Sequence, residues 1–303
     1  MAVMNRANFG ALLEPGLNAL FGLEYDRYDN QCEVLFEQET SERAFEEEQL
    51  LVGFGAAPVK TEGAAIEYDA AYEGWQARYT HVTIALAFSI TEEAVEDNLY
   101  GSLSKRYSKA LARAMHHTKE TRGANIFNNG FNAAFTGGDG VPLFSAAHPL
   151  AEAANQSNIP TTSSDLNEAS LEQAFIDISN WVDDRGIPIA VGAESLHIPA
   201  ELVFTAERLL KTTLRVGTAD NDINAIKNMG MLPGGYHINN RFTDPDAWFI
   251  KTDCPDGAKF FRRAALRNGM EGDFDTGNMR YKARERYSFG WTDWRGYYGS
   301  SGA

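Results

Sequence analysis

The stretch HVTIALAFSITEEAVEDNLYGSLSKRYSKALARAMHHTKE, residues 81–120, decides the fold because its apolar period changes once, near residue 90. Up to that point apolar residues alternate with polar or small ones, which is typical of a β-strand with one packed face. The packed face holds Val82, Ile84, Leu86, Phe88 and Ile90. Ser89 and Glu92 then match a capping box, and apolar residues recur every four positions as far as Met115. This change predicts a long amphipathic helix over about residues 91–120.

A second segment of period two, GNMRYKARERYSFGW, lies near the end of the chain at residues 277–291. Its packed face holds Met279, Tyr281, Ala283, Tyr287, Phe289 and Trp291. Its other face is a basic ribbon, which we define as Arg280, Lys282, Arg284 and Arg286. The helix predicted at 91–120 also has a basic side, formed by Lys105, Arg106, Lys109, Arg113 and Lys119. Strand and helix therefore each combine a packed face with a positively charged face.

The N-terminal third lacks such periodicity. Residues 1–45 are short apolar pieces interrupted by Pro15, Gly16 and Gly22, which predicts an arm that lies against another surface and is not a core element. Residues 46–80 are β-prone pieces broken by several glycines, which predicts a long, loosely packed two-stranded excursion.

The central block, residues 141–265, mixes both kinds of element. A helix from about Asp165 to Gly186, a strand near residue 195, a helix entered after Pro199 and a strand at residues 246–253 predict an α and β unit with its own core. The polar stretch at 151–165 has no period, which predicts an exposed, flexible loop. The chain as a whole is therefore predicted to be α+β.

Charge is unevenly distributed along the 303 residues, whose 42 acids and 27 bases give a net charge of −15. Residues 1–100 hold 19 acids and 5 bases, residues 101–160 hold 3 acids and 6 bases, and residues 259–295 hold 5 acids and 9 bases. Solvated faces explain this separation for an isolated monomer, whereas complementary contacts explain it between neighbouring copies. The negative total and the absence of a run of bases argue against a protein that reads DNA bases.

Metal and disulfide chemistry have little support. Cys32 and Cys254 form no CxxC pair, so they are predicted to be free thiols in a reducing compartment. The adjacent His116 and His117 point about 100° apart on a helix and cannot share a metal, so they are predicted to be surface or interface residues.

Catalytic motifs are also incomplete. Ser145 and His148 lack a GxSxG elbow, and the acidic residues of EGDFDTGN at 271–278 depart from EF-hand order. No catalytic residue, metal ligand or cofactor is therefore predicted, and a cytosolic hydrolase using these groups is a distant alternative. No apolar segment reaches the length of a membrane span, and the first residues do not match a signal peptide.

Longer stretches of the sequence resemble a known protein family. GMLPGGYHINNRFTDPDAWFIKTDCPDGAKFFRR at 230–263 and MEGDFDTGNMRYKARERYSFGWTDWRGYYG at 270–299 resemble the C-terminal part of major capsid proteins of tailed double-stranded-DNA bacteriophages. LFSAAHPL at 143–150 and SLHIPAELVFTAERLL at 195–210 are similar to other parts of that family, and more distantly to the major head subunit of Mu-like phages. The resemblance covers most of residues 80–303 and implies the Hong Kong 97 type of fold.

The resemblance also implies a division of the chain. Residues 1–45 would be the N-terminal arm, and residues 46–80 the extended β-hairpin loop that reaches over a neighbouring subunit. The peripheral domain would comprise residues 81–140 and 266–303, with the helix at 91–120 as its spine, and the axial domain would comprise residues 141–265.

The implied function is that of a non-enzymatic major capsid protein, which self-assembles as pentamers and hexamers into an icosahedral shell. The shell would enclose the phage DNA without sequence-specific binding, after assembly in the host cytoplasm. Implied partners are a portal protein and a separate scaffolding protein, because the short arm has no room for an attached scaffolding region. The sequence leaves open whether cement proteins decorate the shell. An encapsulin-type nanocompartment shell shares the fold and is the alternative.

Contacts between subunits are expected where opposite charges meet. We expect the acidic Glu42, Glu46, Glu47 and Glu48 to contact a neighbour's basic surface, either on the helix at 91–120 or on the ribbon. Lys60 is the only lysine between residues 46 and 104. No partner motif can be assigned to Lys60 for the covalent crosslink found in some members of the family.

Overall fold

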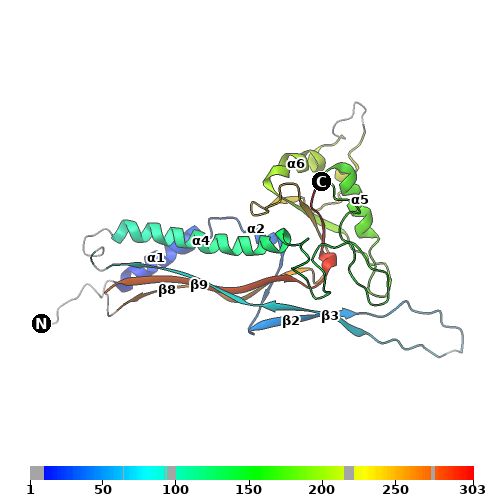
Figure 1. The fold of residues 1–303 in the computed structure, drawn as a ribbon, viewed down its shortest axis with the longest axis horizontal. Coiled ribbons are helices and arrows are strands. Elements are labelled where there is room, and N and C mark those ends of the chain that lie inside the picture. The colour runs from blue at the N-terminus through cyan, green and yellow to red at the C-terminus, as the bar shows by residue number, and fades with distance from the viewer. Residues whose placement is uncertain (1–9, 64, 92, 94–99, 215–221, 274–276) are drawn as a thin grey trace.

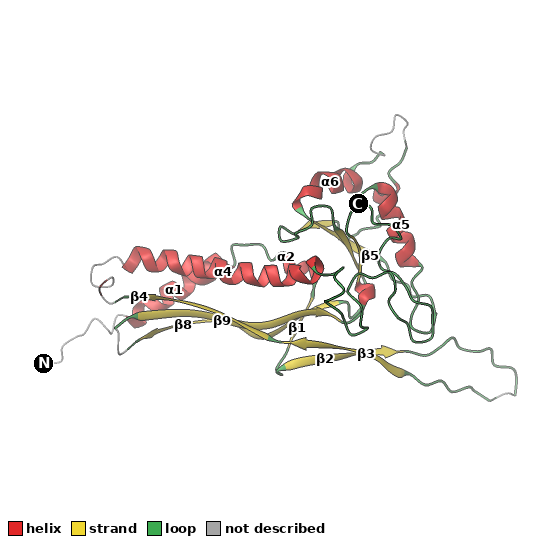
Figure 2. Cartoon of the chain, in the orientation of Figure 1, coloured by secondary structure: helices red, strands yellow, loops and turns green. Residues whose placement is uncertain are grey.

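The computed structural model describes residues 10–63, 65–91, 93, 100–214, 222–273 and 277–303 (Figure 1). The described residues form an elongated layer of helices on a long sheet, a second unit with a sheet of its own, and a projecting hairpin (Figure 2). The chain is thus a mixed α and β protein, as predicted.

The long sheet contains the two segments of period two as neighbouring strands. Its order is β1-β8-β9-β4. The strands are β1 (Glu37–Thr40), β8 (Ala258–Gly272), β9 (Met279–Trp291) and β4 (Val82–Ile90). Val82 lies opposite Tyr287 and Ile90 opposite Met279, so β4 and β9 pair in antiparallel register along their length. The helices α1 (Gly10–Tyr25) and α4 (Tyr100–Asn128) lie on one face of this sheet (Figure 1).

The packed face of β9 forms the core of this layer. Tyr281 and Ala283 are buried with Leu111 and Met115 of α4 and with Phe21 of α1. The next residues along β9 point to the opposite face, and Arg280, Lys282 and Arg284 there are exposed. The predicted alternation of packed and basic faces is therefore confirmed.

The long helix extends further toward the C-terminus than predicted. It continues to Asn128, because the inward side chains of Ala124 and Phe127 remain buried beyond residue 120. Gly123 allows close contact with Cys32, since an added Cβ would lie 2.5 Å from the Cys32 sulfur. The predicted start of the helix and its capping residue Glu92 lie outside the described residues.

The N-terminal segment differs from the predicted arm. Helix α1 continues through Pro15 and Gly16, and Phe21 packs on α4. A short helix, α2 (Gln31–Leu35), buries Cys32 and Leu35, and β1 pairs in parallel with β8. These contacts make the segment part of the core of its own chain, because tertiary packing outweighs the weak helix propensity of the sequence.

The second unit has its own core, as predicted for the central block. Its short sheet has the order β10-β7-β5-β6. The strands are β5 (Ala193–Ile198), β6 (Tyr236–Ile238), β7 (Trp248–Thr252) and β10 (Tyr297–Ser300). The helices are α5 (Glu168–Ser179), the 3₁₀ turn η2 (Ala200–Leu202), α6 (Val203–Lys211) and α7 (Ala225–Met229). Leu171 and Ile178 of α5 pack against Trp248 and Ile250 of β7, and α5 ends at Ser179, earlier than the predicted Gly186.

The chain passes between the two units three times, first after α4, and the other two crossings lie side by side. The chain passes from β7 to β8 and returns from β9 through the 3₁₀ turn η3 (Trp294–Gly296) to β10. The crossings touch, since Thr292 N–H donates to Gly257 C=O at 3.0 Å and a Cβ on Gly296 would lie 2.6 Å from the Gly257 Cα. The predicted domain boundary between residues 265 and 266 falls inside β8, and residues 297–300 pair with the short sheet. Strand pairing, which the sequence does not reveal, joins residues 258–272 to the long sheet and residues 297–300 to the short one.

Candidate functional site

The predicted two-stranded excursion is a hairpin that projects beyond the long sheet (Figure 1). Strands β2 (Phe45–Val52) and β3 (Tyr72–Thr80) pair in antiparallel register, with Phe45 opposite Thr80. We call residues 45–80 the hairpin. The described residues between its strands form no helix or strand.

The root of the hairpin is fastened to the long sheet through a buried lysine. Lys259 of β8 is 4% exposed, and its Nζ lies 2.7 Å from Glu48, 2.8 Å from Asp256 and 3.1 Å from Glu39. Burial lowers the pKa of this lysine, but hydrogen bonds to Asp256, Glu48 and Glu39 outweigh burial, so the pKa lies well above its usual range. Thr292 adds a bond by donating from its hydroxyl to Glu48 at 2.6 Å.

The loop of the hairpin has one polar attachment and many exposed apolar groups. Arg185, from the turn after α5, contacts Asp69 at 3.0 Å and donates to Ala70 C=O at 2.6 Å. Amide N–H donation from Gly55 and Ala70 lowers the pKa of Asp69, with the arginine adding to the effect. The exposed apolar side chains, which include Val59 at 94% and Tyr68 at 98%, are Leu51, Phe54, Val59, Ile66 and Tyr68. Lys60, also in this loop, is exposed.

Most of the predicted acidic contact residues already have partners in their own chain. Glu46 accepts from Ser41 at 2.6 Å, Glu47 lies 3.7 Å from Arg78, and Glu48 belongs to the hairpin root. Glu42 is exposed. Changing all three consecutive glutamates to lysine would break the root of the hairpin, so that change cannot isolate an effect on assembly.

The two predicted basic surfaces lie on opposite sides of the layer. Residues of α4 that face away from the sheet are exposed; they are Lys105, Arg106, Lys109 and Arg113. Lys109 lies 3.7 Å from Glu24 of α1. The exposed ribbon residues lie on the sheet face opposite α4, because they alternate with the buried residues of β9. The structure therefore does not combine the two surfaces into one site.

The ribbon contains a repulsive pair that the sequence pattern did not reveal. Arg267 of β8 is the direct cross-strand partner of Arg284, and both are exposed. On the other side of Arg284 lies Ala85 of β4, and Lys282 lies between Gly269 and Ala87. Like charges directly opposite each other destabilise a sheet, and small neighbours leave their side chains accessible. Arg267 was missed in the sequence because its position opposite Arg284 depends on the bulges of β8.

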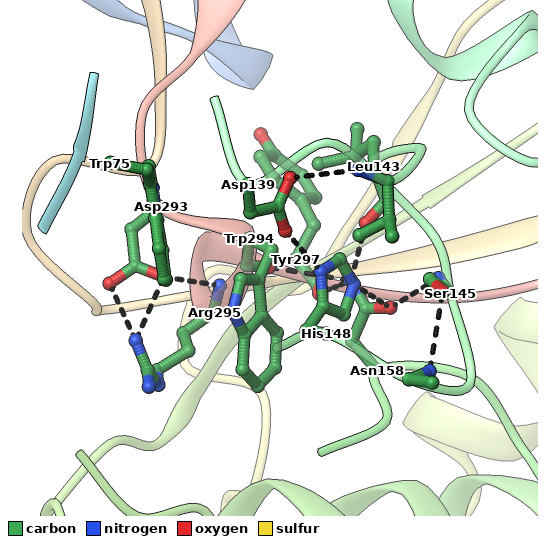
Figure 3. A network of polar contacts seen from close by, with 12 residues as sticks. Trp75, Asp139, Leu143, Ser145, His148, Asn158, Asp293, Trp294, Arg295 and Tyr297 are labelled. Carbon is green, nitrogen blue, oxygen red and sulfur yellow. Dashed lines mark hydrogen bonds and ion pairs between the residues drawn. The ribbon is translucent and has the colours of Figure 1, made fainter. Parts of the chain in front are cut away.

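A buried amide ties the segment at residues 143–145 to β10 beside the crossings (Figure 3). Asn158 is fully buried, and its Nδ2 donates to Leu143 C=O at 2.7 Å and to Tyr297 C=O at 3.0 Å. Its Oδ1 accepts from Ser145 N–H at 2.9 Å. The predicted exposed loop at 151–165 is therefore wrong for its middle part, because a polar residue that satisfies buried backbone groups does not show in a periodicity.

Beside this amide, His148 has both ring nitrogens engaged. Its Nδ1 lies 2.6 Å from Asp139 and its Nε2 lies 3.1 Å from the Asn158 Oδ1, while the ring stacks on Trp294 (Figure 3). Ser145 Oγ accepts from Ala147 N–H. A serine nucleophile needs an imidazole nitrogen as its base, and the contacts of His148 go to other groups. The arrangement fits a structural polar network.

Other candidate groups also have structural surroundings. Asp273 pairs with Arg280, and residues 274–276 of the predicted acidic run lie outside the described residues. The described residues contain no cluster of three or more His, Cys, Asp or Glu side chains suited to a metal. Among the described helices, none is long and apolar enough to cross a membrane. A cavity of about 450 Å³ beside α4 and β9 has apolar lining residues that include Ile126, Phe289 and Trp291. Its polar lining residues include Arg122, Asn125, Asn129 and Ser288.

Comparison with known proteins identifies the family. The family model described as phage capsid protein matches residues 75–300. The chain belongs to the phage capsid protein family. No curated protein is detectably similar to it in sequence. The predicted major capsid protein of tailed phages is confirmed, and this membership supports it over the encapsulin-type shell and the hydrolase.

Solved structures support the fold of this capsid protein. The capsid of an empty GTA particle has a TM-score of 0.54 at 14% identity, covering 90% of each chain. The virus-like particle from Pyrococcus furiosus has a TM-score of 0.53 at 10% identity, covering 94% of this chain and 97% of the other. The capsid of Myoviridae phage XM1 has a TM-score of 0.52 at 11% identity, covering 91% and 93%. The predicted Hong Kong 97-like fold is confirmed.

Proposed function

We propose that this capsid protein assembles as pentamers and hexamers into the icosahedral shell that encloses the phage double-stranded DNA. Heterologous contacts that close into rings build such shells from one kind of chain. The hairpin carries the proposal, because its exposed apolar side chains project away from both cores of their own subunit. Apolar groups gathered on one projecting segment are typical of a surface that a partner covers. The partner is a neighbouring subunit.

The domain assignment is part of this proposal. The unit around the short sheet is the axial domain, which lies near the fivefold and sixfold axes. The layer around the long sheet is the peripheral domain, with α4 as its spine. Their boundary lies at the two adjacent crossings, where β7 continues into β8 and β9 continues into β10.

Replacing Val59 and Tyr68 by serine tests the hairpin contact. We expect the double variant to keep the melting temperature of the unassembled subunit, because both side chains are almost fully exposed. Shells seen by electron microscopy and sedimentation should fall at least about tenfold, since each lost apolar contact recurs in every subunit. Phe204→Ser removes an exposed apolar group outside the hairpin and is the matched control. Shells at the wild-type yield from the double variant would refute the hairpin contact.

The second part of the proposal concerns the ribbon. A subunit that carries Arg267 opposite Arg284 has an uncompensated positive surface, although its net charge is −15. The acidic region around the hairpin of a neighbouring copy, where Glu42 is exposed just before β2, supplies the opposite charge. Complementary charge of this kind sets register and partner choice more than affinity.

Arg284→Glu should maintain or raise the stability of the subunit and should lower the yield of shells. Within the subunit the new carboxylate lies opposite Arg267, so the free energy of unfolding should stay equal or rise by about 0.2–1 kcal/mol. Between subunits it repels the acidic hairpin region, so shell yield should fall and become less sensitive to salt. Chemical denaturation and light scattering measure the two effects. Arg208→Glu, at an exposed position of α6, is the control. Unchanged assembly of the Arg284 variant would exclude the ribbon as a contact surface.

The remaining partners follow from the same role. A separate scaffolding protein, a portal protein and cement proteins complete the proposed virion, whose shell assembles in the host cytoplasm. The net charge of −15 supports enclosing DNA without sequence-specific binding. A wall that bound phosphate strongly would resist the movement of DNA during packaging and ejection.

A further inference from the structure

The N-terminal segment, residues 10–35, docks on the layer through two kinds of contact. One is apolar, where Leu17 and Phe21 of α1 pack against Leu111 and Met115 of α4. The other is a row of buried titratable side chains that belong to α4 and β9. We call these side chains the seam; they are His116, Lys119, Glu120 and Glu285, each at most 5% exposed.

Every member of the seam contacts the N-terminal segment. His116 Nε2 lies 3.1 Å from Asn30 Oδ1, and Lys119 Nζ lies 3.5 Å from Glu33 Oε1. The backbone N–H of Cys32 donates to Glu120 Oε2 at 2.9 Å, and the Tyr25 hydroxyl lies 3.5 Å from Glu285 Oε2. His116 is therefore an interface residue within its own chain and not a surface residue of the helix.

Two carboxyl groups of the seam are incompletely satisfied. Among the described residues, Glu120 Oε1 and Glu285 Oε1 have no hydrogen-bond partner, although His116 Nε2 lies 4.0 Å from Glu120 Oε1. Glu285 also lines a cavity of about 320 Å³, together with Tyr25 and Arg262. An ionised carboxylate in such a place loses its hydration without full compensation, whereas a protonated carboxyl group loses much less.

We propose that the seam is a proton-operated latch for the N-terminal segment. In the docked state Glu120 and Glu285 are protonated and His116 is neutral, so docking is coupled to proton exchange at all three side chains. Release of residues 10–35 from α4 leaves the long sheet folded, because the strands β4, β8 and β9 pair without them. The latch does not depend on the proposed assembly.

Burial and the charged groups around the latch determine how the pKa values of its two carboxyl groups are shifted. Burial raises the pKa of Glu285 to about 7, while Lys119, the Tyr25 hydroxyl and Arg262 act in the opposite direction. Burial also raises the pKa of Glu120, against hydrogen bonds from Cys32 and the charges of Arg241 and Lys119. On the strand of Glu285 itself, Tyr287 is the neighbouring titratable group.

The imidazole of the latch titrates in the opposite sense. Burial lowers the pKa of His116; Arg241, Lys119 and His117 lower it further, and Glu33 opposes them. The rings of Tyr25 and Tyr28 face this imidazole on the segment side.

The signs of these shifts oppose each other. A carboxyl group with a raised pKa weakens docking as the pH rises from its ordinary value of 4.5 toward about 7. An imidazole with a lowered pKa weakens docking as the pH falls below its ordinary value of 6.5. The wild-type segment is therefore docked over a broad pH range. Replacing the imidazole leaves docking with the pH dependence of the carboxyl groups, and replacing a carboxyl group leaves mainly that of the imidazole.

Hydrogen exchange of the full-length, unassembled protein between about pH 5 and pH 7.5 tests the latch. Protection of the α1 and α2 amides is corrected for the intrinsic pH dependence of exchange and compared with the amides of β9. In His116→Gln we expect protection of α1 and α2 to fall at least about tenfold as the pH rises. In Glu285→Gln we expect protection to rise with pH relative to wild type. Glu172→Gln, on the exposed side of α5, should keep the wild-type profile.

The outcomes separate the latch from a purely structural role. Equal slopes in the two seam variants, or a Glu285→Gln profile parallel to that of wild type, would overturn the proposal. Glu120→Gln provides a second carboxyl variant, which should shift the profile in the same direction as Glu285→Gln. Loss of hydrogen-exchange protection in β9 would show that a variant unfolds globally. The proposal would then be tested by comparing the pH profile of the other carboxyl variant with that of wild type.

Discussion

Asn158→Ala should cost about 3–5 kcal/mol of the free energy of unfolding, although it changes one residue in a polar loop. The amide donates to two backbone carbonyls and accepts from Ser145 N–H, all within 3.0 Å. Without it, several buried groups lose their partners, at about 1–3 kcal/mol each. Alanine is too small to rebuild these contacts or to fill the space.

Urea denaturation of the variant and of wild type measures this loss. Asn155→Ala is the matched control, because Asn155 lies in the same loop and is exposed. We expect the control to change stability by less than about 0.5 kcal/mol. Shell yield of the Asn158 variant should also fall, since the amide joins the segment at residue 143 to β10. A loss no larger than that of the control would show that the amide does not hold the segment at residues 143–145 to β10.

Lys259→Met should cost about 2–4 kcal/mol and should loosen the hairpin more than the rest of the subunit. Methionine keeps the length of the side chain but leaves Glu39, Glu48 and Asp256 facing one another without a cation. The expected cost is below that of a fully buried pair because the partner carboxylates are partly exposed. A lysine with a raised pKa contributes fully at neutral pH, and its contribution is lost only as the pH rises through that raised value.

Two measurements separate the local effect from the global one. Chemical denaturation gives the total loss, and hydrogen exchange shows whether β2 and β3 lose protection before β9 does. Lys211→Met removes a lysine that lies 3.3 Å from Glu207 on an exposed helix surface, where the expected change is below about 1 kcal/mol. Similar effects of the two lysine variants would mean that the buried lysine does not fasten the hairpin.

The elements with a strict period were predicted well from the sequence. The strand at 279–291 and the long helix follow from alternation and four-residue spacing, because one face of each is buried. The segment predicted as one strand at 76–90 instead contains the end of β3 and all of β4, and Val82 and Leu86 of its predicted packed face are exposed. Glu285 is the exception within this pattern, since it occupies a packed position of β9 and its neighbours in sequence do not reveal the N-terminal segment above it. The sequence signal for this buried carboxyl group is a charged residue at a position where the alternation places an apolar one.

Features that depend on pairing between distant segments could not be predicted. The pairing of Arg267 with Arg284 requires the bulges of β8, and the role of Lys259 requires Glu39 and Glu48 from the first 50 residues. Helix α1 continues through Pro15 because packing on α4 compensates for its poor local propensity. The acidic residues of the hairpin were assigned to a neighbour because the sequence does not show that Glu48 has a partner at residue 259.

The order of strands in the long sheet also governs when a newly synthesised subunit can fold. Strands β1 and β4, from the first 90 residues, flank β8 and β9, which the ribosome makes last. The contacts at the root of the hairpin likewise form only after Lys259 and Thr292 have been synthesised. Contacts of such long sequence separation form slowly and only after their later partner has emerged. A nascent chain therefore cannot complete its long sheet until β8 and β9 have emerged from the ribosome, which delays its entry into a growing shell.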